Sequence, residues 1–247
     1  MSQAIELAGS EAPPGAREHL LETASTIMRE GDIVDISLSE LSLRSGLNSA
    51  LVKYYFGNKA GLMKALLYRD MEGIVHSVDA LMAKDMAPDV RLKRHIGAVV
   101  ETYYKTPYLN RLLMRLVRDS DAGEAQRIAD SYLTPLSKAY DRLIADGVKL
   151  GLFRNVDPQL FYFTVTGAAD RFFSARLVLR HCYDTDTLTE QLRDRYREHC
   201  IDFIMAGNQP VVSLAQRRQV GIGDPLRFAS IAVTHQQIGR ASGRERV

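Results

Sequence analysis

The segment "LNSALVKYYFGNKAGLMKALLYR" runs from Leu47 to Arg69 and holds basic residues without a single acidic one. The acid-free stretch begins at Leu41, and its basic residues are Arg44, Lys53, Lys59, Lys64 and Arg69. The whole chain is nearly neutral, with 32 lysines and arginines against 30 aspartates and glutamates. A short run of positive charge in such a chain predicts an anionic partner.

Capping residues and a glycine divide this region into two short helices and the start of a longer one. Ser37 or Ser39 can cap a helix that ends at Gly46, and a second short helix is predicted over residues 49–56. Asn58 can cap the longer helix that follows. Two short helices joined by a tight turn have the dimensions of a helix-turn-helix, whose second helix enters the major groove of DNA.

The residues predicted to contact DNA lie in the second short helix and beside it, or at the cap of the first. They are Ser37, Ser39, Asn48, Ser49, Ala50, Lys53, Tyr54, Tyr55 and Lys59. Hydroxyl and ammonium groups suit phosphates, and tyrosine rings suit sugars and thymine methyl groups. The alternative interpretation of the basic segment is a solvated face without a partner.

Apolar residues recur at helical spacing along the rest of the body, and no strand-like alternation occurs. Helices are predicted after Pro88 as far as Thr106, over 108–133 with a break near residue 120, from Pro135, over 158–180 and over 187–205. The sequence therefore predicts an all-α fold.

Residues 208–247 lack a helical period and are expected to be poorly ordered. The last ten residues resemble a translated sequencing adapter, so they are excluded from the functional argument. Residues 211–247 contain six arginines against one aspartate and one glutamate. The positive net charge therefore belongs to this tail, and the body is slightly acidic.

Several classes of protein are not expected. No apolar run reaches the ~20 residues of a membrane span, the N-terminus does not resemble a secretory signal, and two cysteines favour a reducing cytoplasm. His181-Cys182 and His199-Cys200 invite a metal site, but adjacent residues on a helix diverge by about 100°, so packing is the favoured role. No catalytic, cofactor or metal motif is found, and the chain is predicted not to be an enzyme.

The helix-turn-helix segment resembles the N-terminal signature of the tetracycline-repressor (TetR) family of transcriptional regulators. The matching residues are Ser37, Gly46, Tyr54, Tyr55, Phe56, Lys59 and Leu62. A weaker similarity lies in "GVKLGLFRNVDPQLF" at 147–161. The chain departs from the family pattern at Ser42, at Lys53, where the family usually has tyrosine, and at Ala60.

The resemblance implies a cytoplasmic homodimer that represses transcription at a palindromic operator in double-stranded DNA until a small-molecule effector binds. Residues 14–60 would form the DNA-binding domain, 61–83 a connecting helix, and 84–207 the effector-binding and dimerisation domain. Effector binding would shift the connecting helix and change the separation of two recognition helices, which must span ~34–36 Å. An activator of the same fold is left open. The alternative class is an all-α ligand-binding protein or enzyme with a vestigial helix-turn-helix.

The residues predicted to contact the effector are mostly aromatic and lie on the helices of the second domain. They are Tyr103, Tyr104, Phe161, Asp170, Arg171 and Phe172. Core packing is the alternative for each aromatic residue. Asp170 and Arg171 stand inside an apolar stretch, where charges need a partner or water, so they would either orient a polar ligand or pair across a dimer interface.

The helices at 158–180 and 187–205 are too apolar to be covered by one another alone. In a symmetric dimer each pair would meet its copy and form a four-helix contact. The sequence therefore places the predicted dimer interface on these last two helices.

Overall fold

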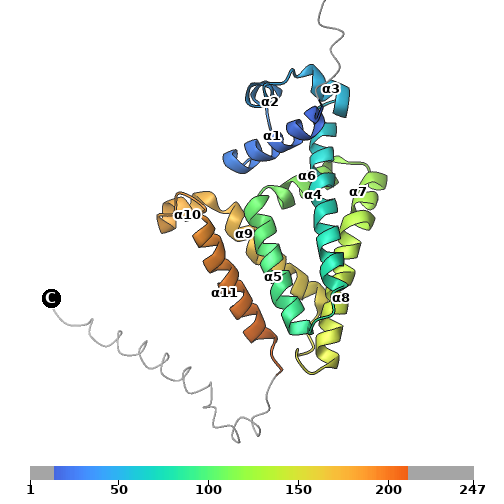
Figure 1. The fold of residues 1–247 in the computed structure, drawn as a ribbon, viewed down its shortest axis with the longest axis vertical. Coiled ribbons are helices and arrows are strands. Elements are labelled where there is room, and N and C mark those ends of the chain that lie inside the picture. Colours follow the sequence, from blue (N-terminus) through green and yellow to red (C-terminus); the bar gives the residue numbers. More distant parts are fainter. Residues whose placement is uncertain (1–13, 211–247) are drawn as a thin grey trace, which may run out of the picture. The chain divides into compact units, whose positions relative to one another are not determined.

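The computed structural model describes residues 14–210 of the chain, which form helices joined by short loops (Figure 1). No strand occurs between residues 14 and 210, so the predicted all-α fold is confirmed. The tail beyond residue 210 lies outside the described residues. No helix in the described range is long and apolar enough to cross a membrane.

Four helices form the N-terminal part of the structure. They are α1 (Ala16–Gly31), α2 (Leu38–Ser45), α3 (Ala50–Phe56) and α4 (Lys59–Met82). Helix α1 packs against α2, α3 and α4. Leu20, Leu41, Val52 and Leu62, one from each helix, are fully buried in a shared core. This core holds the two short helices in place, because neither is long enough to be stable alone.

Local capping explains where α2 and α4 begin and where α2 ends, as the sequence predicts. The Ser37 hydroxyl accepts a hydrogen bond from the Glu40 N–H at 3.5 Å, and the Asn58 side chain accepts one from the Gly61 N–H at 2.9 Å. Gly46 ends α2 in the left-handed region with φ of 69°, a conformation that favours glycine.

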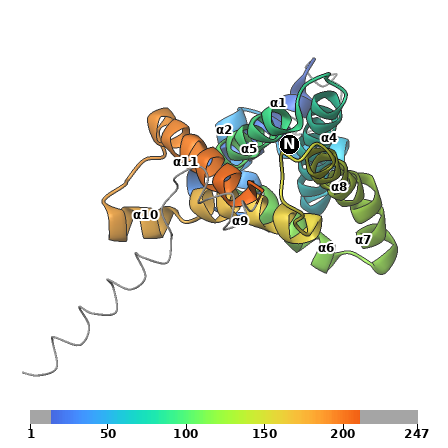
Figure 2. The same cartoon turned by 90° about the horizontal axis from the view of Figure 1, so that it is seen from below.

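The remaining helices form the C-terminal part. They are α5 (Pro88–Lys105), α6 (Leu109–Asp119), α7 (Ala122–Ile128), the π-helical turn η1 (Ala129–Leu133), α8 (Thr134–Lys149), α9 (Pro158–Ser174), α10 (Arg176–Tyr183) and α11 (Glu190–Asn208). Helix α5 packs against α8, α9 and α11, while α4 packs against α5, α6 and α8 (Figure 2).

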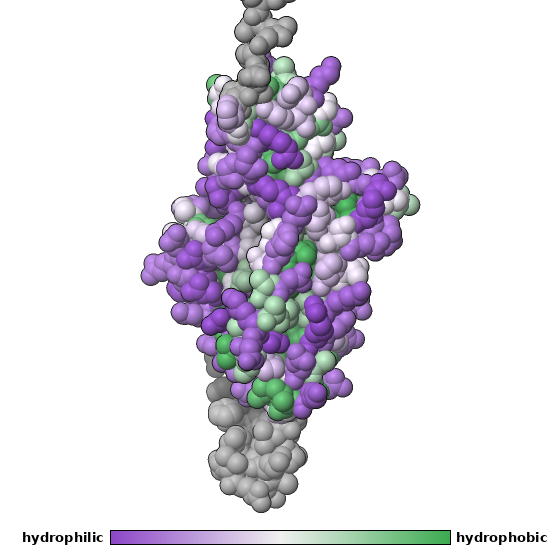
Figure 3. All heavy atoms as spheres, turned by 45° about the vertical axis from the view of Figure 1, so that its right-hand side comes forward, coloured by the Kyte–Doolittle hydropathy of each residue, from purple (hydrophilic) through white to green (hydrophobic). Residues whose placement is uncertain are grey.

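Helix α4 connects the two parts of the structure. Its first half shares the core of α1 to α3, and the same cluster extends to α6 and α8, against which α4 also packs. A separate cluster joins α5, α8, α9 and α11. Polar side chains dominate the face in Figure 3, and apolar groups appear there only as small separate patches.

The end of the described chain differs from the prediction in two respects. The helix predicted over 158–180 is broken at Ala175, and the segment after the break, α10, has no buried residue. The last helix begins at Glu190, with the Thr189 side chain accepting from the Leu192 N–H, and continues to Asn208. Asn208 is buried, so residue 208 belongs to the helix rather than to the tail.

Candidate DNA interface and effector cavity

The second helix of the helix-turn-helix presents its N-terminal end to solvent. Asn48, Ser49, Ala50 and Lys53 are exposed, and Tyr54 is 74% exposed. The Asn48 side-chain oxygen accepts from the Ala50 N–H at 2.8 Å, which fixes this residue at the start of α3. The exposed end of α3 therefore offers amide, hydroxyl and ammonium groups of the kinds that contact bases and phosphates.

The other predicted contact residues are less free. Tyr55 is half-buried and packs against the N-terminal core, with its ring 4.9 Å from that of Tyr54. Ser37 and Ser39 are exposed, and Ser37 already caps α2. Lys59 forms an ion pair with Asp35, whose pKa is lowered chiefly by its hydrogen bond from the lysine.

Ion pairs with carboxylates from other segments offset much of the positive charge that the sequence places in residues 41–69. Arg44 pairs with Glu30 at 2.6 Å, Lys64 with Glu124, and Arg69 with Glu18 at 3.0 Å. These carboxylates come from segments distant in sequence, so they were invisible to an argument from the segment alone. Lys53 is the basic residue of the segment that forms no ion pair within residues 14–210.

Arg17 was not predicted and lies beside the end of the second helix. Its guanidinium carbon is 5.4 Å from the centre of the Phe56 ring, and its side chain is exposed. Arg17 of α1 therefore places a positive charge next to the C-terminal end of α3. Because Arg17 lies outside residues 41–69, the charge pattern of that segment gave no reason to include it.

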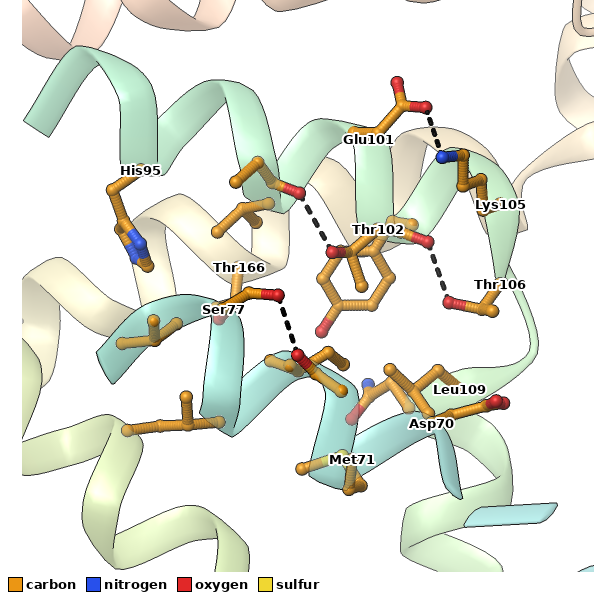
Figure 4. A pocket seen from close by; sticks show the side chains of 18 of the residues that line it. Asp70, Met71, Ser77, His95, Glu101, Thr102, Lys105, Thr106, Leu109 and Thr166 are labelled. Atoms are coloured by element: carbon orange, nitrogen blue, oxygen red, sulfur yellow. Dashed lines mark hydrogen bonds and ion pairs between the residues drawn. The ribbon is translucent and has the colours of Figure 1, made fainter. Parts of the chain in front are cut away.

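A cavity of about 500 Å³ opens between α4, α5, α6, α8 and α9. Its walls are mainly apolar, with Ile74, Val78 and Leu81 from α4 and Val99 from α5. Figure 4 shows polar residues of its lining, including His95 at one end and Asp70, Thr106 and Lys105 toward the other. A cavity of this size and character suits a mainly apolar small molecule.

One of the six residues predicted to contact an effector, Tyr103, lines this cavity. Phe161 is buried in the C-terminal core, and Phe172 stacks on Tyr196 with ring centres 3.8 Å apart. Tyr104 faces Phe173 and the Arg193 guanidinium. These three aromatic side chains therefore pack against other side chains and do not line the cavity.

The charged pair in the apolar stretch does not form an ion pair within the described residues. Asp170 accepts a hydrogen bond from the Asn110 side-chain amide at 2.8 Å, while its second carboxylate oxygen is buried without a partner. Arg171 is exposed. Neither residue lines the cavity, although Asn110 does.

The lining also includes His95, Tyr140 and Tyr162, which are not among the six predicted contact residues. They lie on the inward faces of α5, α8 and α9, where apolar or aromatic residues at helical spacing indicate burial but not a cavity. His95 is 3% exposed, and burial lowers its pKa to about 4. The imidazole is therefore neutral at pH 7.

A hydrogen-bond network joins the cavity wall to α1. Asp70, in the lining, accepts from the Tyr108 hydroxyl at 2.8 Å, and that hydroxyl lies 2.8 Å from the Ser25 hydroxyl of α1. Asp70 also holds Arg69, which reaches Glu18 of α1. Burial raises the pKa of Asp70 despite the neighbouring guanidinium.

Apolar side chains remain uncovered on the last helices. Leu160 and Phe163 of α9, Leu177 of α10 and Phe203 of α11 are each more than 60% exposed. Exposed apolar groups on neighbouring helices are typical of a surface that another protein covers. Among the described residues, no cluster of three or more histidine, cysteine, aspartate or glutamate side chains could hold a metal ion.

Comparison with known proteins identifies relatives of this chain. Residues 85–212 match the family model described as "Tetracyclin repressor-like, C-terminal domain". The HTH-type transcriptional regulator BetI 1 of Chromohalobacter salexigens is 22% identical over 129 residues, which are 49% of this chain. The match spans 62% of that relative, less than two thirds of its length.

Solved structures share the fold at low sequence identity. A transcriptional regulator of the TetR/AcrR family from Thermobifida fusca aligns with a TM-score of 0.58 and 21% identity, over 78% of this chain and 98% of that one. The transcriptional regulator FadR from Bacillus subtilis, in complex with stearoyl-CoA, aligns with a TM-score of 0.54 and 13% identity, over 77% and 98%. These similarities show the arrangement of the helices.

Proposed function

The chain belongs to the tetracycline repressor-like family of transcriptional regulators, and we propose that it is a homodimeric repressor that leaves its DNA operator when a small molecule fills the cavity. Residues 14–60 form the DNA-binding domain, 61–83 the connecting helix, and 84–207 the domain for the effector and the second subunit. The protein acts by binding and not by catalysis.

The observation that carries this proposal is the continuity of α4. The helix starts at Lys59, separated by only two residues from the end of the DNA-facing helix α3, and it carries the cavity residues Met71, Ile74 and Val78. Gly61 in its first turn lies so close to α3 that a Cβ atom there would be 1.9 Å from the Phe56 carbonyl oxygen. A displacement of α4 by a ligand is therefore passed directly to α3.

The contacts of Asp70 provide a second connection. A ligand that fills the cavity contacts the wall formed by Asp70, and through Tyr108 and Ser25 this wall is joined to α1. Replacing Asp70 with asparagine keeps the size of the side chain and removes its charge. We expect Asp70→Asn to bind DNA and effector but to release DNA less completely, because the effector and DNA sites are then less strongly coupled.

The dimer is proposed from the uncovered apolar residues of α9, α10 and α11. Two copies of this surface related by a two-fold axis would cover one another and orient two α3 helices toward successive turns of one duplex. The separation needed is about 34–36 Å, and palindromic half-sites follow from the symmetry.

The test is to map DNA protected by the full chain in the region beside its own gene, and to measure transcription from that region. For a repressor, we expect a protected palindrome when the protein is present and increased transcription when it is omitted. The competing class, a ligand-binding protein or enzyme with a vestigial helix-turn-helix, expects no protection. Protection with reduced transcription on omission would indicate an activator.

A matched variant distinguishes DNA recognition from loss of folding. Lys53→Glu reverses a charge on the exposed face of α3, and Lys93→Glu makes the same change on the exposed face of α5. Protection that is lost with Lys53→Glu and retained with Lys93→Glu supports the proposed orientation of α3. Equal effects of the two variants would contradict it.

A further inference from the structure

Two polar side chains in the effector cavity have no hydrogen-bond partner within the described residues. His95 of α5 and Tyr140 of α8 are 3% and 2% exposed. Both ring nitrogens of His95 and the hydroxyl of Tyr140 are buried without a partner. The two rings meet edge to face with their centres 4.8 Å apart, so their unused polar atoms lie in one region of the cavity.

Unpaired polar atoms in a buried place are costly and uncommon. A buried donor or acceptor without a partner costs roughly 1–3 kcal/mol, and most such groups in proteins are satisfied. Two other tyrosines follow that rule: the Tyr108 hydroxyl donates to Asp70, and the Tyr196 hydroxyl donates to the Ala168 carbonyl at 2.7 Å. His95 and Tyr140 depart from the rule where the wall borders a cavity.

The charge at this end of the cavity limits what can bind. The His95 imidazole is neutral at pH 7, and so is the Tyr140 phenol, whose pKa burial raises further above its ordinary value. The cation of the lining, Lys105, is paired with Glu101 at 3.1 Å and stands ten residues from His95, about 15 Å along α5. A carboxylate or phosphate beside His95 would therefore be buried with no permanent cation of the lining nearby.

The chemistry of the two groups also indicates what the ligand must supply. A neutral imidazole and a phenol each contain one donor and one acceptor. A hydroxyl group can donate to one and accept from the other, and a carbonyl group can accept from either. The rest of the cavity, through Val78, Leu81 and Leu136, offers apolar contact.

We propose that the effector is an uncharged, mainly apolar molecule whose hydroxyl or carbonyl group binds between His95 and Tyr140. This inference rests on the proposed role of the cavity as the effector site. It separates this chain from a regulator of similar fold that was solved with stearoyl-CoA, a ligand that carries phosphate groups.

The test uses four probes with one hydrocarbon chain and different end groups: decanol, decanone, decanoate and decylammonium. Calorimetric titration of the full chain at pH 7 measures their affinities. Decanol and decanone are expected to bind at least tenfold more tightly than the two ions. If decanoate or decylammonium binds most tightly, the cavity remains an effector site but the inference about its ligand is overturned.

Variants then show whether the two polar groups are responsible. Tyr140→Phe keeps the ring and removes only the unpaired hydroxyl, so we expect threefold to tenfold weaker decanol binding and an unchanged or higher melting temperature without ligand. His95→Leu is expected to weaken decanol binding similarly. Tyr104→Phe, on α5 but outside the cavity lining, is the matched control and should leave binding unchanged.

The outcomes distinguish this inference from the proposed function. Decanol binding that is unaffected by both Tyr140→Phe and His95→Leu overturns the polar site while leaving the cavity as a binding site. If none of the four probes binds, the cavity fails as an effector site, and the inference fails with it. DNA protection is measured separately and does not depend on either result.

Discussion

Replacing Lys53 with alanine tests whether α3 faces DNA. Lys53 is exposed, and within the described residues it forms no ion pair, unlike Arg44, Lys59 and Lys64. Each phosphate contact contributes about 0.9 to the slope of log affinity against log salt concentration. If Lys53 contacts one phosphate, Lys53→Ala should lower the slope by about 0.9 per bound subunit. At 0.1 M salt, the same contact is worth roughly an eightfold change in affinity per subunit.

Fluorescence anisotropy of a labelled duplex, titrated at several salt concentrations, measures both quantities. A random duplex is sufficient, because phosphate contacts do not depend on sequence. Lys93→Ala removes an exposed lysine from α5, and Lys64→Ala removes one that pairs with Glu124. Both controls should keep the wild-type slope. A wild-type slope for Lys53→Ala would refute the placement of α3 on DNA. If Lys93→Ala lowered the slope as much as Lys53→Ala, the change would be due to the net charge of the protein and not to a contact of α3.

Three further predictions concern other parts of the molecule. Gly61→Ala would place Cβ 1.9 Å from the Phe56 carbonyl oxygen, so α3 and α4 must separate. We expect a loss of about 1–3 kcal/mol of unfolding free energy in chemical denaturation, and at least tenfold weaker duplex binding. Unchanged values of both would contradict the close packing of the two helices. His95 has a pKa of about 4 when folded against 6.5 when unfolded, so the unfolded chain binds the extra proton between these values and the unfolding free energy falls as pH drops from 6.5 to 4. The loss is about 3 kcal/mol and should be absent in His95→Leu when the two proteins are compared across that range, whereas parallel pH profiles would indicate an ordinary histidine pKa. Phe203→Glu, at a residue 72% exposed on α11, should yield monomers in analytical ultracentrifugation, and a dimer of unchanged affinity would place the interface elsewhere.

Local signals explain the parts of the fold that the sequence predicted well. Ser37, Gly46 and Asn58 determine helix ends through hydrogen bonds within a few residues or through a backbone angle, and each acts as predicted. The break at Ala175 has no such signal, since neither glycine nor proline is present there. The segment after the break has no buried residue, and burial depends on tertiary structure.

The candidate sites were predicted less completely, and for two physical reasons. First, basic residues that are close in sequence form ion pairs with carboxylates from distant segments, as Lys64 does with Glu124 of α7. The hydrogen bond from Lys64 is the main reason why the pKa of Glu124 falls to about 2. Second, aromatic residues on one helix face are expected both in a packed core and in the wall of a cavity, so the sequence could not distinguish the two. Phe172 is used in stacking, whereas Tyr103 reaches the cavity.

The most direct test of DNA recognition by this chain is selection from a pool of random duplexes by the purified full-length protein. We expect enrichment of a palindrome whose half-site centres lie about one helical turn, 34–36 Å, or a multiple of it apart. We also expect that Lys53→Glu fails to enrich that sequence while Lys93→Glu succeeds. A pool that remains unenriched after selection with the wild-type protein would contradict the assignment of residues 14–60 as a sequence-specific DNA-binding domain.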